Sequence, residues 1–207
     1  MTCDHIQLYY GVSSGEFEAL NPEIQCGALP PNCMGCIVAL EGEGAIQAVG
    51  TIPEWSPYAV NTIDVVSAHN RHRRMHSVGD LKWSARLAEA AQSWADNCWF
   101  EHSKFYYGEN VAVGQQHINK AVDDWYAEER FYNYQFPFFS EDVGHFTQIV
   151  WSGTREVGCA IGYCPQGVTV GSTTWFGRLY VCEYYPAGNS FGRFASNVFH
   201  PGGSSEL

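Results

Sequence analysis

The residues best placed for chemistry centre on one histidine, His145, near the start of the segment GHFTQIVW (144–151). The four apolar residues of this segment follow a spacing that predicts one buried helical face, so packing is expected to fix the imidazole at the mouth of a helix. A histidine held in this way can act as a metal ligand or as a general acid or base. The alternative is an ordinary core histidine whose ring nitrogens are satisfied by neighbouring groups.

Three other stretches carry histidine and carboxylate side chains that could join His145. They are EHS (101–103), GEN (108–110) and WYAEE (125–129). In the last stretch, two glutamates follow the tryptophan at helical spacings of three and four, so either can share its face. Two imidazoles and two carboxylates that converge in a cleft form a reasonable site for a divalent cation. No serine or cysteine lies in a recognisable nucleophile motif.

The sequence resembles the CAP superfamily, the cysteine-rich secretory, antigen 5 and pathogenesis-related 1 proteins, over about residues 60–200. GHFTQIVW and YVCEYYPAGN (180–189) look like the two family signatures, and HNRHRRMH (69–76), CWFEHS (98–103) and GEN match further blocks in order. The pattern EVGCAIGYC (156–164) is similar to that of the fungal and yeast secreted, sterol-binding members. The resemblance implies an α/β fold, a three-layer α-β-α sandwich from about residue 58.

The resemblance also implies which residues form a site. The four-residue cluster of the family maps onto His102, Glu109, Glu128 and His145, and the family spacing selects Glu128 over Glu129. We therefore expect His102 and His145 to bind a divalent cation directly, zinc or magnesium, with Glu109 and Glu128 in supporting positions. Members keep this cluster without an agreed reaction, so an enzymatic activity is left undecided and is less favoured than binding.

A second candidate site is the apolar segment at 131–139, which links the third predicted helix to His145. It contains six aromatic side chains, and Pro137 prevents a regular helix. A loop this apolar is either packed against the domain or exposed as a surface for a ligand. In yeast-type relatives the equivalent loop is implicated in sterol binding, and other members hold fatty acids between helices. By that resemblance, we expect a sterol-accepting surface to include Tyr134, Phe136, Phe138 and Phe139.

Regular elements must position these side chains. Apolar periodicity predicts helices at 62–76, 84–98 and 118–130, strands at 156–163 and 179–185, and a turn at 171–174. Thr62 is the expected cap of the first helix, and GEN is expected to form a turn. The first helix carries His69, His72 and His76. Their arginine neighbours repel a cation, so we interpret these histidines as a solvated or buttressing face.

Eight cysteines fall into two groups of four, between residues 3 and 36 and between residues 98 and 182. This number and this split indicate two disulfide-stapled units in an extracellular protein. By the fungal pattern we expect the pairs Cys98–Cys159 and Cys164–Cys182. The pairing of the first group is left open among three connectivities, for Cys3, Cys26, Cys33 and Cys36.

The first forty residues are similar to a fungal LysM module, which binds chitin-type oligosaccharides. The match rests on TCDHIQ (2–7), YGVSSGEFEALNP (10–22) and CIVAL (36–40), and it lacks the first strand of that module. Glycines and prolines predict a linker at 41–57. The CAP-like domain is expected at 58–200, followed by a flexible tail at 201–207.

The net charge of −11, with only 11 lysine and arginine residues, argues against nucleic acid and anionic membrane surfaces as partners. No stretch reaches the roughly 18 apolar residues of a membrane span, and the amino terminus is not a signal peptide. We expect a secreted, extracellular protein in a processed or recombinant form, with association with the cell wall as an option. The leading prediction is binding of sterols or related small lipids, with a divalent-cation site. The alternatives are a chitin-oligosaccharide-binding protein acting through the LysM-like module and a metal-dependent hydrolase.

Overall fold

The computed structural model describes residues 60–202 of the 207-residue chain. The LysM-like module, the linker and the first four cysteines therefore lie outside the described residues. The α-helices are α3 (Thr62–Met75), α4 (Ala85–Ala95), α5 (Ile118–Tyr126) and α6 (Gly144–Val150). The strands are β1 (Lys82–Trp83), β2 (Gly108–Val113), β3 (Glu156–Val170) and β4 (Thr173–Tyr185). Short 3-10 helices are η2 (Ala127–Phe131), η3 (Glu141–Val143) and η4 (Phe194–Ser196).

The four strands form one sheet in the order β1-β3-β4-β2. Strand β1 is parallel to β3, whereas β4 is antiparallel to both β3 and β2. The β3–β4 hairpin extends well beyond the two predicted strands. Pro165, Gly167 and Gly177 interrupt the sequence pattern there, and the structure accommodates part of this interruption by a shift in register between Cys164 and Val168.

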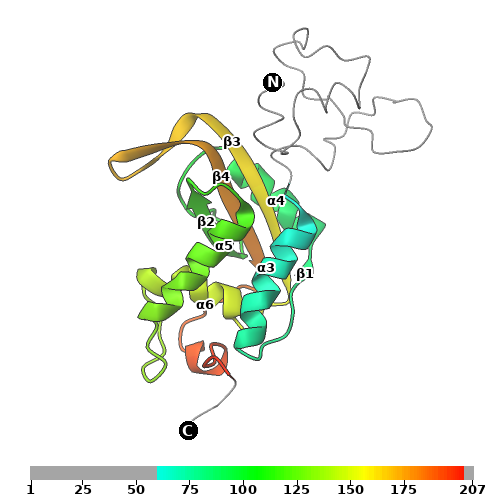
Figure 1. Ribbon diagram of the computed structural model, residues 1–207, viewed down its shortest axis with the longest axis vertical. Helices are drawn as coiled ribbons and strands as arrows, with labels where there is room; N and C mark the ends of the chain where they lie inside the picture. The colour runs from blue at the N-terminus through cyan, green and yellow to red at the C-terminus, as the bar shows by residue number, and fades with distance from the viewer. Residues whose placement is uncertain (1–59, 203–207) are drawn as a thin grey trace, which may run out of the picture. The chain divides into compact units, whose positions relative to one another are not determined.

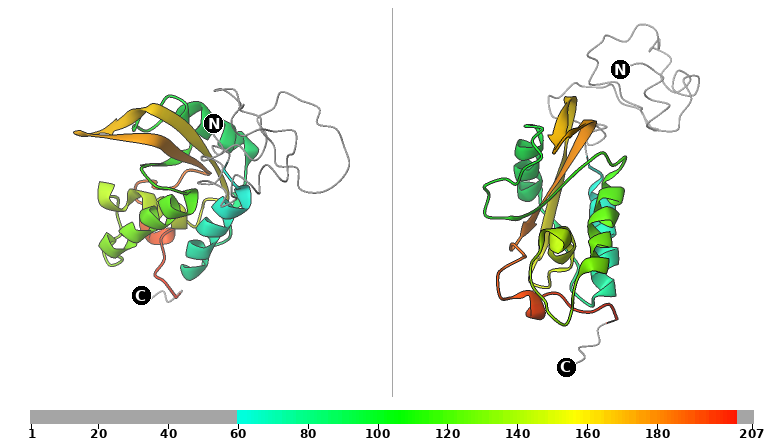
Figure 2. Two further views of the ribbon diagram at one scale, coloured as in Figure 1. Left: turned by 45° about the horizontal axis from the view of Figure 1, so that its top comes forward. Right: turned by 90° about the vertical axis from the view of Figure 1, so that its left-hand side faces the viewer.

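Helix α4 covers one face of the sheet, while α3, α5 and α6 cover the other (Figure 1, Figure 2). The predicted three-layer α-β-α arrangement is thereby confirmed. On the first face, Ala91 and Ala95 of α4 lie in a small apolar core. A Cβ atom at Gly162 of β3 would fall 2.0 Å from the carbonyl oxygen of Ala95, so only glycine lets the helix approach the strand this closely.

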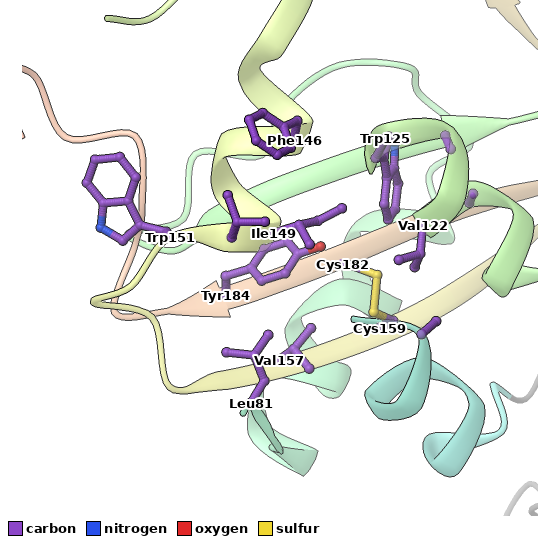
Figure 3. Close-up of a cluster of buried hydrophobic side chains, with 14 of the residues drawn as sticks. Leu81, Val122, Trp125, Phe146, Ile149, Trp151, Val157, Cys159, Cys182 and Tyr184 are labelled. Carbon is purple, nitrogen blue, oxygen red and sulfur yellow. A yellow bond between two sulfur atoms is a disulfide. The ribbon is translucent and has the colours of Figure 1, made fainter. Parts of the chain in front are cut away.

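The larger core lies on the other face of the sheet and is built from α3, α5, α6, β3 and β4 (Figure 3). The apolar residues of the segment 144–151 are all buried there, as the helical spacing predicted. Phe146 and Ile149 have no exposed surface, and Tyr184 of β4 is equally buried among them. Packing therefore fixes helix α6 and, with it, the position of His145.

The disulfides link Cys98 to Cys164 and Cys159 to Cys182, so the predicted pairing is wrong. Cys159 lies directly opposite Cys182 in the β3–β4 ladder, and both belong to the larger core. Side chains alternate between faces along a strand, so Cys164, five residues after Cys159, points to the α4 face. Cys98 follows α4 on that same face, where Cys164 is its one possible partner among residues 60–202.

The ends of the predicted helices differ from the observed ones in three places. Helix α3 is capped by Asn61 rather than Thr62, because the Asn61 side chain accepts hydrogen bonds from the backbone of Ile63 and Asp64. Helix α4 stops at Ala95, and Cys98 has a φ of +57°, which no right-handed helix contains. The third predicted helix continues after Tyr126 only as the 3-10 turn η2.

The three histidines of α3 are buried, so they buttress the fold and do not form a solvated face. His69 contacts the Tyr184 hydroxyl at 2.8 Å, and His76 contacts the Tyr126 hydroxyl at 2.9 Å. Burial lowers the pKa of His69 to about 4, so this ring is neutral at physiological pH. These contacts connect α3 to the sheet and to α5.

Arg73 is another buried polar residue of α3, and its side chain is completely buried. Its guanidinium donates hydrogen bonds to four backbone carbonyls, those of Gly79, Ile149, Trp151 and Thr154. The donor–acceptor distances are 2.7, 2.8, 2.9 and 3.1 Å, respectively. A single side chain thus connects α3 to the end of α6 and to the loop before β3.

No helix among residues 60–202 is long and apolar enough to cross a membrane.

Candidate functional site

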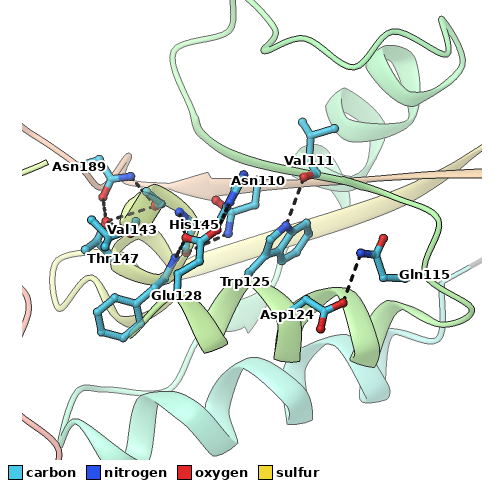
Figure 4. Close-up of polar contacts among 12 residues, drawn as sticks. Asn110, Val111, Gln115, Asp124, Trp125, Glu128, Val143, His145, Thr147 and Asn189 are labelled. Carbon is cyan, nitrogen blue, oxygen red and sulfur yellow. Dashed lines mark hydrogen bonds and ion pairs between the residues drawn. The ribbon is translucent and has the colours of Figure 1, made fainter. Parts of the chain in front are cut away.

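His145 is held by the carboxylate of Glu128, which lies in the turn η2 directly after α5 (Figure 4). Glu128 Oε1 lies 2.6 Å from His145 Nδ1. Its Oε2 accepts hydrogen bonds from the backbone N–H groups of His145 and Phe146, at 3.0 and 3.1 Å. The first N–H groups of a helix have no partner within it, so Oε2 of Glu128 caps α6. The other oxygen of the same carboxylate orients the imidazole.

The surroundings of His145 come from three separate segments of the chain. Asn110 Nδ2 donates to the backbone oxygen of His145 at 3.1 Å, and Asn189 Nδ2 donates to that of Gly144 at 2.8 Å (Figure 4). The Trp125 indole stacks on the His145 ring with centroids 5.9 Å apart. The start of α6 is therefore fixed by contacts from β2, α5 and the segment after β4.

The two glutamates that follow Trp125 have separate roles. Glu128 contacts His145, as described, whereas Glu129 accepts a hydrogen bond from the Tyr134 hydroxyl at 2.8 Å. Glu129 thus supports the aromatic loop. The choice of Glu128 as the partner of His145, which came from the family spacing, agrees with this geometry.

His102 forms a second histidine–carboxylate pair with Glu109. His102 Nδ1 lies 2.7 Å from Glu109 Oε1, and the backbone N–H of Ser103 donates to both carboxylate oxygens, at 3.0 and 3.1 Å. The hydrogen bond to Glu109 raises the pKa of the largely exposed His102. Burial works to raise the pKa of Glu109, but hydrogen bonds from His102 and Ser103 outweigh it, and the net pKa is lowered.

Glu109 lies in strand β2, so the prediction of a turn at Gly108-Glu109-Asn110 is wrong. Gly108 made a turn plausible, but its role is to permit a close approach to Gln148. A Cβ atom at position 108 would fall 1.9 Å from Gln148 Oε1. The chain then continues as an extended edge strand paired with β4.

Glu183, which sequence reasoning did not select, faces Glu109 across the β2–β4 ladder. It has no exposed surface. Burial, together with the negative charge of Glu109, raises the pKa of Glu183 to about 9, so its carboxyl group is protonated at neutral pH. The available signal was a single carboxylate inside the apolar run YVCEYY of a predicted strand.

The four predicted cation-site residues are thus brought together as two pairs. Each pair uses the histidine Nδ1 for the carboxylate and leaves Nε2 as the nitrogen for a metal, the chemistry expected of supporting carboxylates. Along β2, Glu109 shares the α4 face with Val111, whereas Asn110 faces α6. Within residues 60–202, no three histidine, cysteine or acidic side chains are grouped so that they could hold a metal ion. Direct ligation by His102 and His145 stays a prediction.

The aromatic loop at 131–139 divides into a packed part and an exposed part. Tyr132 is buried, and the Tyr134 ring packs on it edge-to-face with centroids 4.8 Å apart. Phe136, Phe138 and Phe139 are 66%, 64% and 49% exposed. We call these three side chains the phenylalanine surface. Of the four residues predicted to accept a sterol, Tyr134 is therefore mainly a support.

Comparison with known proteins shows which family this domain resembles. Residues 66–184, more than half of the chain, match the family described as the Cysteine-rich secretory protein family, CAP. The chain is 44% identical to Protein PRY2 of Saccharomyces cerevisiae over 139 residues, which span 65% of this chain and 40% of that protein. It is 40% identical to Repressed by EFG1 protein 1 of Candida albicans over 152 residues, 67% of this chain and 53% of that protein.

The similarity to these relatives covers only about half of their length or less. Among solved structures, the chain is similar to NaASP2 with Zn²⁺, with a TM-score of 0.52 and 22% sequence identity, over 67% of this chain and 84% of that one. This similarity supports the fold. The family match over residues 66–184 shows that the chain belongs to the CAP family, the cysteine-rich secretory proteins.

Proposed function

We propose that this protein is a secreted binding protein for sterols or related small lipids. The observation that carries the proposal is the phenylalanine surface, three large apolar rings within four residues that stand exposed next to the buried core. Exposed apolar side chains that lie close together commonly mark a binding surface, whereas a single exposed apolar residue does not. Apolar area removed from water by a ligand contributes about 25 cal/mol per Å².

The loop is also held firmly enough to present this surface. Tyr134 is anchored to Glu129 and lies against the His200 ring, with centroids 4.3 Å apart. A Cβ atom at Gly144 would lie 3.0 Å from the Phe139 ring, so this ring sits directly beside the start of α6. A binding surface supported by packed neighbours loses little entropy when a ligand binds.

Charge and cysteine usage are consistent with an extracellular lipid carrier. The net charge of −11 disfavours anionic headgroups and leaves uncharged sterols as suitable ligands. Two disulfides within the described residues favour an oxidising compartment. One relative, 37% identical over 150 residues, is named Secreted protein RBT4 of Candida albicans.

The test is a sterol titration of the triple variant Phe136→Ser, Phe138→Ser, Phe139→Ser. We expect its affinity for a labelled cholesterol analogue to fall by about tenfold or more, because the loss of anchoring aromatic rings commonly costs over 1.4 kcal/mol. The melting temperature is expected to change little, since the three rings are exposed. The control is Phe191→Ser, which alters a 99% exposed phenylalanine outside the loop.

Two outcomes would count against the sterol proposal. Saturable binding that survives in a folded triple variant would place the lipid elsewhere in the chain. A large loss of melting temperature would mean that the rings are core residues and that the loop has no free surface.

A separate proposal concerns cation binding by the two histidine–carboxylate pairs. Both histidines present Nδ1 to a carboxylate, an orientation that favours metal binding through Nε2. Calorimetric titration with Zn²⁺ is expected to show uptake by the wild type that is lost when His102 and His145 are both replaced by alanine. Replacement of the exposed His117 is the control. Unchanged stoichiometry in the double variant would reject both histidines as ligands.

A further inference from the structure

A pocket of about 500 Å³ lies at the amino-terminal end of α5, beside the β3–β4 hairpin. The loop between β2 and α5 forms one side, and Trp175 of β4 forms the other. Its volume is within the range of small-molecule sites. The aromatic loop follows the opposite end of α5, which is about 13 Å away along a helix of nine residues. The pocket is therefore distinct from the phenylalanine surface.

The apolar wall of this pocket is the Trp175 indole, which is 44% exposed. It packs directly on the backbone of Gly114, where a Cβ atom would fall 2.6 Å from the ring. Gly114 also has a φ of +92°, a conformation that favours glycine. The indole is thus seated in a fixed place while much of its surface stays accessible.

The loop opposite Trp175 is tied to β4 through its backbone. The Tyr180 hydroxyl donates to the carbonyl of Gln115 at 3.2 Å, and the Arg178 guanidinium donates to that of Gln116. These bonds leave the side chains of the loop available to line the pocket. A preformed pocket costs a ligand less ordering than a mobile loop does.

The polar lining is balanced in charge. Lys120 and Asp124 form an ion pair one helical turn apart. Gln115 Nε2 donates to the second oxygen of Asp124 at 3.3 Å (Figure 4). Gln115 Oε1 is buried, and it has no hydrogen-bond partner within residues 60–202. A buried acceptor without a donor is costly, and rotation of the Gln115 side chain, which lines the pocket, would bring Oε1 to an N–H or O–H group of a ligand.

These features select a class of ligand. A paired lysine and aspartate give no net charge to attract an ion, and the amide, ammonium and carboxylate groups disfavour a purely apolar molecule. A pyranose ring presents C–H groups to an aromatic face and hydroxyls to polar side chains. We propose that this pocket binds a neutral pyranose sugar, with an N-acetylhexosamine favoured because its amide N–H can donate to Gln115 Oε1.

The test uses the full chain and two disaccharides, N,N′-diacetylchitobiose and cellobiose, which lacks the acetamido groups. Binding is followed by NMR through the indole N–H signal of Trp175, assigned with the variant Trp175→Phe. We expect the signal to shift on titration and the affinity to be higher for diacetylchitobiose. In Trp175→Ala, affinity measured by calorimetry is expected to fall about tenfold or more.

The matched control is Phe176→Ala, which removes the next side chain of β4. This ring is 71% exposed and does not line the pocket, so affinity is expected to stay within about twofold. Gln115→Ala is expected to reduce the preference for diacetylchitobiose over cellobiose. Circular dichroism confirms that each variant is folded.

Three results would overturn the assignment. Failure of the folded wild type to bind either sugar would reject a pyranose site. If Trp175→Ala keeps the wild-type affinity, the sugar binds outside this pocket, either elsewhere in the domain or within residues 1–40. An unchanged preference in Gln115→Ala would reject the role of its Oε1. None of these outcomes bears on sterol binding, because the pocket and the phenylalanine surface share no residue.

Discussion

Replacement of Arg73 by methionine is expected to lower the free energy of unfolding by about 2–5 kcal/mol, since leaving a buried acceptor without its donor costs about 1–3 kcal/mol. The guanidinium is completely buried and donates to four backbone carbonyls. Methionine fills much of the same space but donates nothing, so each carbonyl loses this hydrogen bond inside the protein. The carbonyls of Trp151 and Thr154 keep a second donor, from the Thr154 N–H and the Arg155 guanidinium. Burial lowers the pKa of Arg73 to about 10, which still leaves the group charged at neutral pH. Urea denaturation measures the effect.

The matched control for this prediction is Arg74→Met. Arg74 is the next residue of α3, and its side chain is exposed and paired with Asp80 at 2.5 Å. Exposed ion pairs are screened by water and contribute little to stability, so we expect almost no change in the urea midpoint. A similar loss of unfolding free energy in the two variants would mean that the hydrogen bonds of Arg73 to the loops around α6 contribute nothing specific. The loss would then reflect only the removal of a positive charge from α3.

The role of Arg73 was missed because the polarity of α3 conceals its periodicity. His69, His72, Arg73 and His76 follow the spacing i, i+3, i+4, i+7, which is the pattern of an inward helical face. Polar residue types at these positions pointed to solvent, and the helix itself was still predicted with nearly correct bounds. Only tertiary contacts reveal that carbonyls and tyrosine hydroxyls satisfy His69, Arg73 and His76.

The disulfides show a different reason for an incorrect prediction. The pairing was transferred from a family pattern, although the strand alternation already separated the cysteines. Cys159 and Cys164 are an odd number of residues apart on one strand, so they cannot both face α4 or both face the larger core. The partner of Cys98 was therefore open to a geometric argument once the strand was known to extend to residue 164.

Sequence reasoning identified the residues of the candidate site but not how they are arranged. The family resemblance named the four residues that form the two observed contacts, His102 with Glu109 and His145 with Glu128. It did not show that these contacts form separate pairs, because the face of Glu109 depends on its place in β2. The turn predicted at 108–110 concealed that strand, and with it the position of Glu183 opposite Glu109.

Replacement of Glu183 by glutamine is expected to stabilise the protein increasingly as pH rises. The pKa of Glu183 is raised to about 9 in the folded protein, from 4.5 in the unfolded chain. Burial is the larger cause, and the negative charge of Glu109 is the second. Between these values the folded state holds a proton that the unfolded chain releases. The contribution of Glu183 is therefore fully present below pH 4.5 and is lost as pH rises toward 9.

Glutamine keeps a neutral side chain of similar shape and does not titrate. The melting temperatures of Glu183→Gln and wild type should therefore be close at pH 5 and separate at pH 9. One pKa unit corresponds to about 1.4 kcal/mol, so a shift of even two units predicts a difference of roughly 5 °C or more. Calorimetry at pH 5, 7 and 9 measures it, with the exposed Glu141→Gln as control. A difference independent of pH would show that Glu183 is ionised in the folded state. The negative charge beside His102 would then be shared by two carboxylates instead of residing on Glu109 alone.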